Sequence, residues 1–202
     1  MFREMRRNRQ ILTQAECEAI LAACTNGVLA VSGDDGYPYA VPLSYVYRDN
    51  KIFFHCAKTG HKLDAIARNE KVSFCVVGQD LIVPEKYTTC YRSVIAFGKA
   101  RRLEDAAEKR AALELLAEKY SPEQVEGRAK EIDQQFAHVC MVEIAIEHMT
   151  GKEAIELVRE REAQAEESAK ARKKAGSKFQ QNGTCSRPFR LCALPLSSAP
   201  PA

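Results

Sequence analysis

The segment KIFFHCAKTGHKLDAI, residues 51–66, carries the residues best suited to chemistry. An apolar strand is expected to end at His55. After a turn at Gly60, a helix is expected to begin with His61 and Lys62. The start of a helix has unpaired backbone N–H groups and the positive end of the helix macrodipole, and cationic side chains there favour a bound phosphate. The pattern predicts an anion site, with an ordinary solvated lysine as the alternative.

Other reaction types lack their usual signatures in this sequence. The chain has no GxSxG motif, no P-loop and no GxGxxG motif. Its eight cysteines form neither a CxxC pair nor a Cys/His set at zinc spacing, and most lie in apolar patterns typical of buried thiols. The sequence therefore predicts no metal site and favours a reducing, cytoplasmic compartment.

Short strands joined by polar turns dominate the sequence around this segment. The expected strands are Val28–Ser32, Tyr39–Tyr47, Ile52–Cys56, Val72–Val77, Tyr91–Leu103 and Val139–Met149. The expected helices begin at Thr13 and at His61 and cover Glu104–Tyr120 and Ala129–Phe136. Because βαβ alternation is mostly absent, the pattern predicts a mainly β (α+β) fold, an antiparallel barrel of six strands with peripheral helices.

Three local features add detail to this prediction. Thr13 and Glu16 have the spacing of a capping box at the start of the first helix. Pro84 and the polar run KYTTC are interpreted as a long connection between two strands. In the last strand, Val139 and Met141 are expected to pack on one face, and Glu143 and Glu147 are expected on a second face.

Residues 1–163 are expected to form one domain, and residues 164–202 a disordered or non-native tail. No apolar run approaches the roughly 20 residues that a membrane span needs. The basic start, MFREMRRNRQ, is not followed by the apolar stretch of an export signal. The net charge of the chain is +3. Residues 164–202 carry 7 − 2 = +5, so residues 1–163 carry 23 − 25 = −2 and are slightly acidic. Neither a membrane nor a nucleic acid is therefore an expected partner.

The strand Tyr39–Tyr47 offers an apolar wall that could lie beside the cationic helix start. Such a combination suits a ligand that is flat at one end and phosphorylated at the other. Flavin mononucleotide (FMN) has that shape.

Four sequence runs, PLSYVY, IFFHCAKTGHKLDAI, CYRSVIAFGKARRLED and TGKEA, occur in this order. Over about residues 3–160 the chain closely resembles the FMN-binding split-barrel superfamily of pyridoxamine 5′-phosphate oxidase, and within it the nitroimidazole-resistance branch. The resemblance implies a six-stranded antiparallel split β-barrel with peripheral helices, FMN as the cofactor and a homodimer.

The resemblance also implies roles for individual residues. The implied cofactor-binding residues are Val41, Pro42, Leu43, Ser44, His55, Cys56, His61, Lys62, Arg92 and Ser93. His61 and Lys62 stand where the family has the basic pair for the FMN phosphate, with His61 in place of the oxidase's arginine. His55 is the implied catalytic residue, which orients or protonates the acceptor, although its position alone also suits a core histidine. Arg92 either reaches the flavin of a second subunit or anchors the dimer. Pro42 indicates a strand at an edge or a bulge.

The function implied by the resemblance is an FMN-dependent oxidoreductase. It would pass electrons from NAD(P)H to a small acceptor such as a nitroimidazole or another nitroaromatic compound. The arginine-rich end that recognises pyridoxine phosphate in the oxidase has no counterpart near residues 148–163, so vitamin B6 oxidation is not expected. A flavin- or haem-binding protein without redox turnover and a structural dimer with an empty barrel are the alternatives.

Overall fold

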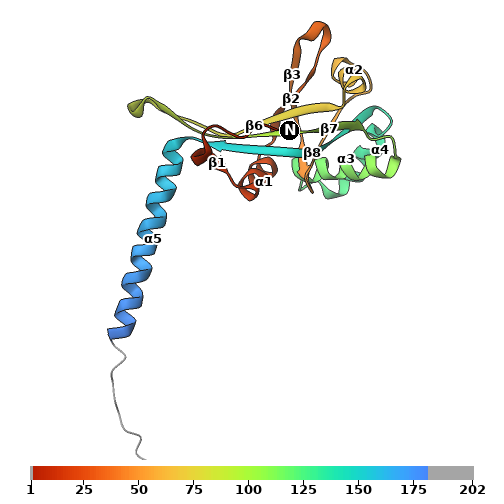
Figure 1. Ribbon diagram of the computed structural model, residues 1–202. Helices are drawn as coiled ribbons and strands as arrows, with labels where there is room; N and C mark the ends of the chain where they lie inside the picture. The colour runs from red at the N-terminus through yellow and green to blue at the C-terminus, as the bar shows by residue number, and fades with distance from the viewer. Residues whose placement is uncertain (1, 182–202) are drawn as a thin grey trace, which may run out of the picture. The chain divides into compact units, whose positions relative to one another are not determined.

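The computed structural model describes the backbone of residues 2–181 and the side chains of residues 2–172 (Figure 1). The chain forms two units, residues 1–159 and residues 160–202, which we describe separately. The strands of the first unit are β1 (Ile11–Leu12), β2 (Asn26–Ser32), β3 (Pro38–Ser44), β4 (Val46–Arg48), β5 (Lys51–Ala57), β6 (Lys71–Val83), β7 (Thr88–Arg102) and β8 (Val139–Glu153). Its helices are α1 (Gln14–Ala23), α2 (His61–Arg68), α3 (Ala106–Tyr120) and α4 (Val125–Gln135).

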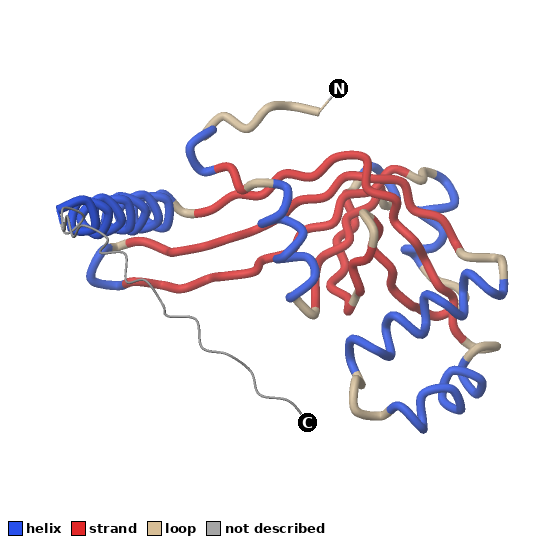
Figure 2. Tube along the Cα trace, turned by 90° about the horizontal axis from the view of Figure 1, so that it is seen from below, coloured by secondary structure: helices blue, strands red, loops and turns tan. Residues whose placement is uncertain are grey.

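The strands form one antiparallel sheet in the order β3-β2-β6-β7-β8-β5-β4, and β1 pairs with β8. The predicted fold class, a mainly antiparallel β structure with peripheral helices, is confirmed. The described residues contain eight strands rather than six, because Ile11–Leu12 also pairs and because the expected strand Tyr39–Tyr47 is interrupted at Tyr45. Figure 2 shows the curled strands, with α3 and α4 at one end.

The interruption at Tyr45 is where the barrel is split. Strands β3 and β4 lie at opposite ends of the hydrogen-bonded order, yet only this residue separates them along the chain. The Tyr45 side chain is fully buried, and its hydroxyl donates to the carbonyl oxygen of Leu21 at 2.8 Å. The hydroxyl of Tyr120, the last residue of α3, accepts from Tyr45 N at 3.0 Å and donates to Tyr45 O at 2.8 Å. A side chain therefore satisfies the backbone groups that the strand break leaves without a ladder partner.

The core has two parts, separated by the alternation of side chains along the strands. On β5, Phe54 faces the barrel interior together with Leu29 and Phe74. Its neighbour Phe53 faces the other side and packs with Leu113 of α3. Helix α1 lies across one face of β6, β7 and β8 (Figure 1).

Several expected turns and caps are confirmed. Thr13 caps α1 and forms the predicted capping box with Glu16. The turn between β4 and β5 contains Asp49 and Asn50, both with positive φ, as a two-residue hairpin turn requires. These local signals act through neighbouring backbone groups, which is why the sequence reveals them.

The predicted long connection around Pro84 is wrong. Instead β6 and β7 stay paired as far as Val83 and Thr88 and form a projecting hairpin, which we call the arm (residues 77–93; Figure 1). Pro84 lies in the short turn at its tip, where its missing N–H costs no ladder bond. The residues on either side, including Leu81, Ile82 and Thr89, have side chains that favour strands.

The expected placement of Glu143 on a different face from Val139 and Met141 is also wrong, because the period of two puts all three residues on one face. Glu143 is only 5% exposed, because the Nζ atom of Lys51 and the Nε atom of Arg101 each lie 3.0 Å from its carboxylate. Burial alone would raise the pKa of this carboxyl group, but the hydrogen bonds from Arg101 and Lys51 outweigh burial and lower it. Glu147, by contrast, is exposed.

The predicted boundary between residues 163 and 164 lies within a helix. Helix α5 (Ile155–Gln181) crosses it, and residues 164–181 of the expected tail lie in this helix. The remainder of the expected tail, residues 182–202, lies outside the described residues. None of the described helices combines the length and the apolar character that a membrane crossing would need.

Candidate functional site

The start of α2 is open on the side where an anion would bind. The helix begins at His61 after Gly60, as predicted, and the φ of Gly60 is +132°, which side-chain-bearing residues rarely adopt. The N–H groups of Leu63 and Asp64 donate to the Gly60 carbonyl oxygen at 2.9 and 3.2 Å. The two preceding N–H groups are those that a helix start leaves without an intrahelical partner. A Cβ atom built on Gly60 would meet no atom within 4 Å, so the space before the helix is free.

The His61 imidazole packs against the hairpin formed by β2 and β3. Its ring stacks on Tyr39, with the ring centroids 4.1 Å apart and an interplanar angle of 23°. Its Nε2 atom is buried and makes no hydrogen bond among the described residues, although Asp34 Oδ2 lies 3.5 Å away. Asp34 itself accepts a hydrogen bond from Arg68 at 2.6 Å, so a permanent cation already pairs with its carboxylate. The Nε2 atom thus faces the Asp34 carboxylate and Gly33 of the β2–β3 turn, and it is the free space before the helix that fits a phosphate group.

Lys62 is half-buried and lies near the end of β5. Burial and the neighbouring Cys140 raise the pKa of Cys56 to about 11, while the positive charges of Lys62 and Arg102 act in the opposite direction. The charge of Lys62 therefore acts on the end of β5 as well as on the helix start. The helix start therefore combines one permanent positive charge with the imidazole of His61.

His55 and Cys56 lie on opposite faces of β5, as neighbouring residues of a strand must. Cys56 packs against the barrel interior. His55 is exposed and lines a cavity of about 480 Å³ with Ser44. The cavity walls are mostly apolar and come mainly from α3 and α4, with Leu113, Leu116, Ala117 and Ile132 among them. Of these two predicted residues, only His55 reaches the cavity.

Strand β3 presents the predicted residues Val41 to Ser44 on alternating faces. Val41 and Leu43 pack against the same interior cluster as Leu63 of α2, which brings the strand and the helix together. Pro42 and Ser44 are exposed on the other face. Because β3 is an end strand of the sheet, one of its edges has no strand partner among residues 2–181, and the interpretation of Pro42 as an edge residue is confirmed.

Arg92 and Ser93 lie on the part of β7 that belongs to the arm. The Nε atom of Arg92 is 3.2 Å from Oε2 of Glu153, which is its register partner on β8 and is fully buried. Neutralising a buried carboxylate is a structural task. A contact of Arg92 or Ser93 with a cofactor of a second subunit stays a prediction.

Sequence analysis missed three residues around His61: Asp34, Tyr39 and Arg68. A signal for Tyr39 was present, because the period of two along β3 puts it on the same face as Val41. Asp34 lies in the turn between β2 and β3, and only the packing of that hairpin on α2 brings it to Arg68. No spacing in the sequence indicates this contact.

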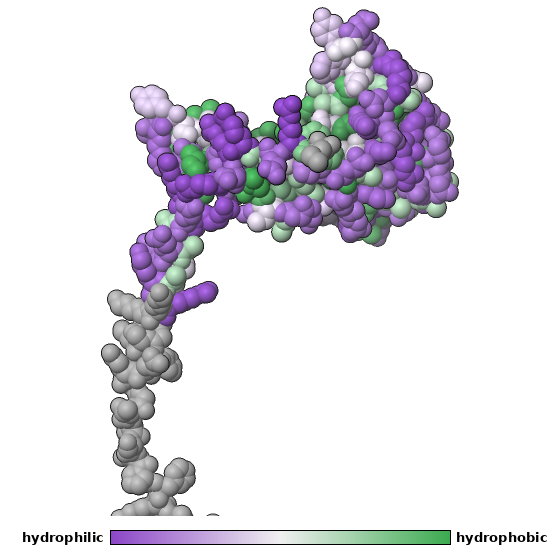
Figure 3. All heavy atoms as spheres, viewed as in Figure 1, coloured by the Kyte–Doolittle hydropathy of each residue, from purple (hydrophilic) through white to green (hydrophobic). Residues whose placement is uncertain are grey.

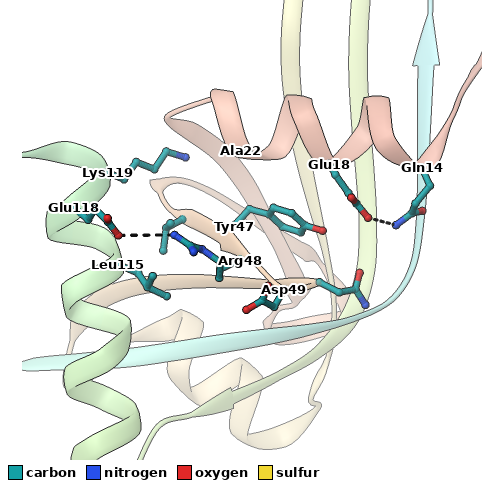
Figure 4. A pocket seen from close by; sticks show the side chains of 11 residues that line it. Gln14, Glu18, Ala22, Tyr47, Arg48, Asp49, Leu115, Glu118 and Lys119 are labelled. Carbon is teal, nitrogen blue, oxygen red and sulfur yellow. Dashed lines mark hydrogen bonds and ion pairs between the residues drawn. The ribbon is translucent and has the colours of Figure 1, made fainter. Parts of the chain in front are cut away.

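A second cleft, of about 690 Å³, lies between α1, α3 and the β4–β5 turn (Figure 4). None of the predicted site residues lines it. Two polar pairs are formed within the cleft: Gln14 donates to Glu18 at 2.8 Å, and Arg48 lies 3.8 Å from Glu118. With these groups already paired, the cleft is a weaker candidate than the start of α2 and the His55 cavity.

The comparisons with known proteins agree with this fold. The family model described as pyridoxamine 5′-phosphate oxidase matches residues 13–153, and the chain belongs to this family. No curated protein matches the chain.

Several solved structures are similar to the chain. One is a proposed 5-nitroimidazole antibiotic resistance protein from Bacteroides thetaiotaomicron, with 23% identity and a TM-score of 0.62 over 70% of this chain and 85% of that chain. An FAD-binding protein from Mesorhizobium loti has 27% identity and a TM-score of 0.53 over 72% of this chain and 97% of that chain. An FAD and haem binding protein from Mycobacterium smegmatis has 20% identity and a TM-score of 0.61 over 72% and 73% of the two chains. These similarities support the split-barrel fold.

Proposed function

We propose that the protein is an FMN-binding oxidoreductase that passes electrons from NAD(P)H to a small acceptor, such as a nitroimidazole or another nitroaromatic compound. The observation that carries the proposal is the open start of α2, where the space before Gly60 is free and Lys62 adds a positive charge. Membership of the pyridoxamine 5′-phosphate oxidase family supports it. So do the solved structures of similar fold that are described as flavin-binding or as a nitroimidazole resistance protein.

Different residues of the chain would bind the cofactor and act on the acceptor. Lys62, His61 and the first N–H groups of α2 would hold the phosphate of the cofactor. When bound, FMN would supply the transfer of hydride or single electrons. His55 would position or protonate the acceptor in the cavity, whose apolar walls would limit the access of water. No side chain is required to act as a nucleophile.

We further propose that the active form is a homodimer. Val28, Cys75 and Ile95 are register neighbours on β2, β6 and β7, and Val77 lies two residues beyond Cys75, so the four share one face of the sheet. The exposed fractions of Val28, Val77 and Ile95 are 37%, 59% and 40%. Figure 3 shows apolar residues exposed along the sheet between the arm and the β2–β3 hairpin. An uncovered apolar sheet face is a common feature of subunit interfaces.

The activity can be tested with the full-length protein. We expect purified protein loaded with FMN to lose its yellow colour on anaerobic addition of NADH or NADPH and to regain it when a nitroimidazole is added. Bleaching that no nitroaromatic compound reverses would contradict the proposed acceptor class. A bound flavin that neither nicotinamide reduces would contradict the proposed donor.

A flavin- or haem-binding protein without turnover is the second candidate. The Mycobacterium smegmatis protein of similar fold is described as binding FAD and haem, and here an exposed histidine, His55, lines an apolar cavity. Histidine is a common axial ligand of haem iron. Protein that is colourless on purification and develops a Soret band with haem, but binds no flavin, would favour this candidate.

A further inference from the structure

Two cysteines face each other across neighbouring strands, and the resemblance implies a cofactor contact for only one of them, Cys56. Cys56 of β5 and Cys140 of β8 are direct register partners, one pair before the end of the ladder at Ala57 and Val139. Directly opposed residues of an antiparallel pair have Cα atoms about 4.5 to 5.5 Å apart. A disulfide needs a Cα separation of about 4.4 to 6.8 Å. The Cα separation therefore lies within the range of a disulfide.

The register also fixes which type of pair the two cysteines form. The N–H group of Ile146 donates to the carbonyl oxygen of Asn50 at 3.1 Å, which continues the ladder between β8 and β5. Ile146 and Asn50 therefore form a hydrogen-bonded pair, and hydrogen-bonded and non-hydrogen-bonded pairs alternate along such a ladder. Cys140 lies six residues before Ile146, so the pair of Cys140 and Cys56 is also hydrogen-bonded. The expected Cα separation is then the wider one, about 5.5 Å, which a disulfide tolerates. The Cβ atoms of such a pair are also at the wider end of about 4.5 to 5.5 Å, whereas a disulfide needs about 3.5 to 4.5 Å, so the bond would draw the strands together and be readily reduced.

The side chains of the two cysteines point the same way. Cys140 is buried in the interior cluster and Cys56 packs against that cluster. Cys140 contributes to the raised pKa of the Cys56 thiol, and the Cys140 thiol donates to the carbonyl oxygen of Met141 at 3.7 Å. All six cysteines in the described part of the chain are free thiols. The other strand cysteines in that part face different residues: Cys75 faces Ile95, and Cys90 faces Leu81.

We propose that Cys56 and Cys140 are a redox-active dithiol, which a low-molecular-weight disulfide converts into an intramolecular disulfide between β5 and β8. The half-buried Cys56, as its thiolate, attacks one sulfur of the external disulfide, releases one thiol and becomes a mixed disulfide. Cys140 then attacks the Cys56 sulfur and releases the second thiol. In total the two cysteines lose two electrons and two protons, and the external disulfide takes up these electrons and protons to become two thiols.

The surroundings of the pair determine how readily it reacts. Burial holds the pKa of Cys56 at about 11, so only a small fraction is thiolate at neutral pH, while Lys62 and Arg102 favour that fraction. We therefore expect oxidation to be slow near pH 7 and faster as the pH rises. The bond would fix the end of the strand that presents His55 to its cavity.

The test uses the reduced full-length chain without flavin, so its outcome does not depend on the proposed function. The protein is incubated with oxidised glutathione at pH 7 and at pH 9, its remaining thiols are blocked, and it is digested with trypsin. We expect a disulfide that links the peptide of residues 52–58 to that of residues 131–152, with two of the eight thiols lost. Dithiothreitol should restore both thiols.

Single variants separate this pair from other cysteines. Cys140→Ser should trap a glutathionyl group on the peptide of residues 52–58, because the resolving thiol is gone. Cys75→Ser, which removes a half-buried thiol elsewhere in the sheet, should still form the link. The proposal would be overturned if these two peptides stayed unlinked while other cysteines reacted, or if all eight thiols persisted at equilibrium.

Discussion

His61 and Lys62 are neighbours in sequence but have different environments. The His61 ring is held between Tyr39 and Asp34, whereas Lys62 is half-buried near Cys56. A cation at a helix start opposes the macrodipole and destabilises the folded protein slightly unless an anion binds there. The arrangement is therefore better suited to binding than to stability.

Lys62→Ala should weaken FMN binding by about 10- to 100-fold, because a hydrogen bond to a charged group contributes about 1.5 to 3 kcal/mol. Folding should be nearly unchanged. Fluorescence titration of FMN gives the dissociation constant, with Lys86→Ala at the tip of the arm as the charge-matched control. Equal affinity of the Lys62 variant and the wild type would remove Lys62 from the phosphate site.

His55→Ala should keep flavin affinity within about twofold but slow the reoxidation of reduced flavin by a nitroimidazole. The reason is that His55 lines the cavity rather than the helix start. Proton transfer by a positioned side chain contributes about 100-fold or more to a rate. Stopped-flow absorbance of the flavin measures this step. If its rate were unchanged, His55 would have a structural role alone.

Helix α3 not only covers the sheet but also forms hydrogen bonds to the backbone at the strand break. Its last residue, Tyr120, satisfies both backbone groups of Tyr45 at the point where β3 ends and β4 begins. The barrel is therefore held at its split by a helix rather than by a strand ladder.

Tyr120→Phe should lower the free energy of unfolding by about 1 to 3 kcal/mol, because it leaves the buried N–H and C=O groups of Tyr45 without this partner. Urea denaturation followed by circular dichroism measures the change. Tyr87→Phe is the control, since Tyr87 is 98% exposed, and its effect should stay within about 0.5 kcal/mol. Equal stability of both variants would show that water replaces the Tyr120 hydroxyl.

Elements defined by local signals could be predicted from the sequence, and those defined by distant contacts could not. The capping box at Thr13 and the start of α2 at His61 depend on residues a few positions apart. The burial of Glu143 depends on Lys51 and Arg101, which come from two other strands. The break at Tyr45 likewise requires Tyr120, 75 residues later, so no period in the sequence reveals it.

The candidate site was predictable to a similar extent. The β5–α2 segment was predicted as a site from its own pattern, because strand, turn and helix follow each other closely there. The roles of the β3 residues came from the resemblance to the family. The opposite orientation of His55 and Cys56 follows from strand alternation and was available from the sequence. The environment of His61 could not be predicted from the sequence, because Asp34 approaches it only through the packing of the β2–β3 hairpin on α2.

For the whole molecule, the uncovered sheet face predicts the oligomeric state. Ile95→Glu should convert a dimer into a folded monomer, because association would bury an unpaired carboxylate. Light scattering after size-exclusion chromatography measures the mass, and circular dichroism checks folding. Val125→Glu on α4, where the valine is 66% exposed, is the matched control and should remain dimeric. A dimer that persists in the Ile95 variant would place the interface elsewhere.

The binding of FMN to the wild-type protein tests the central claim most directly. Isothermal titration of the flavin-free protein with FMN, and separately with riboflavin, measures both the affinity and the contribution of the phosphate. We predict one site per chain, with FMN bound at least tenfold more tightly than riboflavin because the start of α2 recognises the phosphate. No binding of FMN, or equal affinity for the two flavins, would contradict the claim.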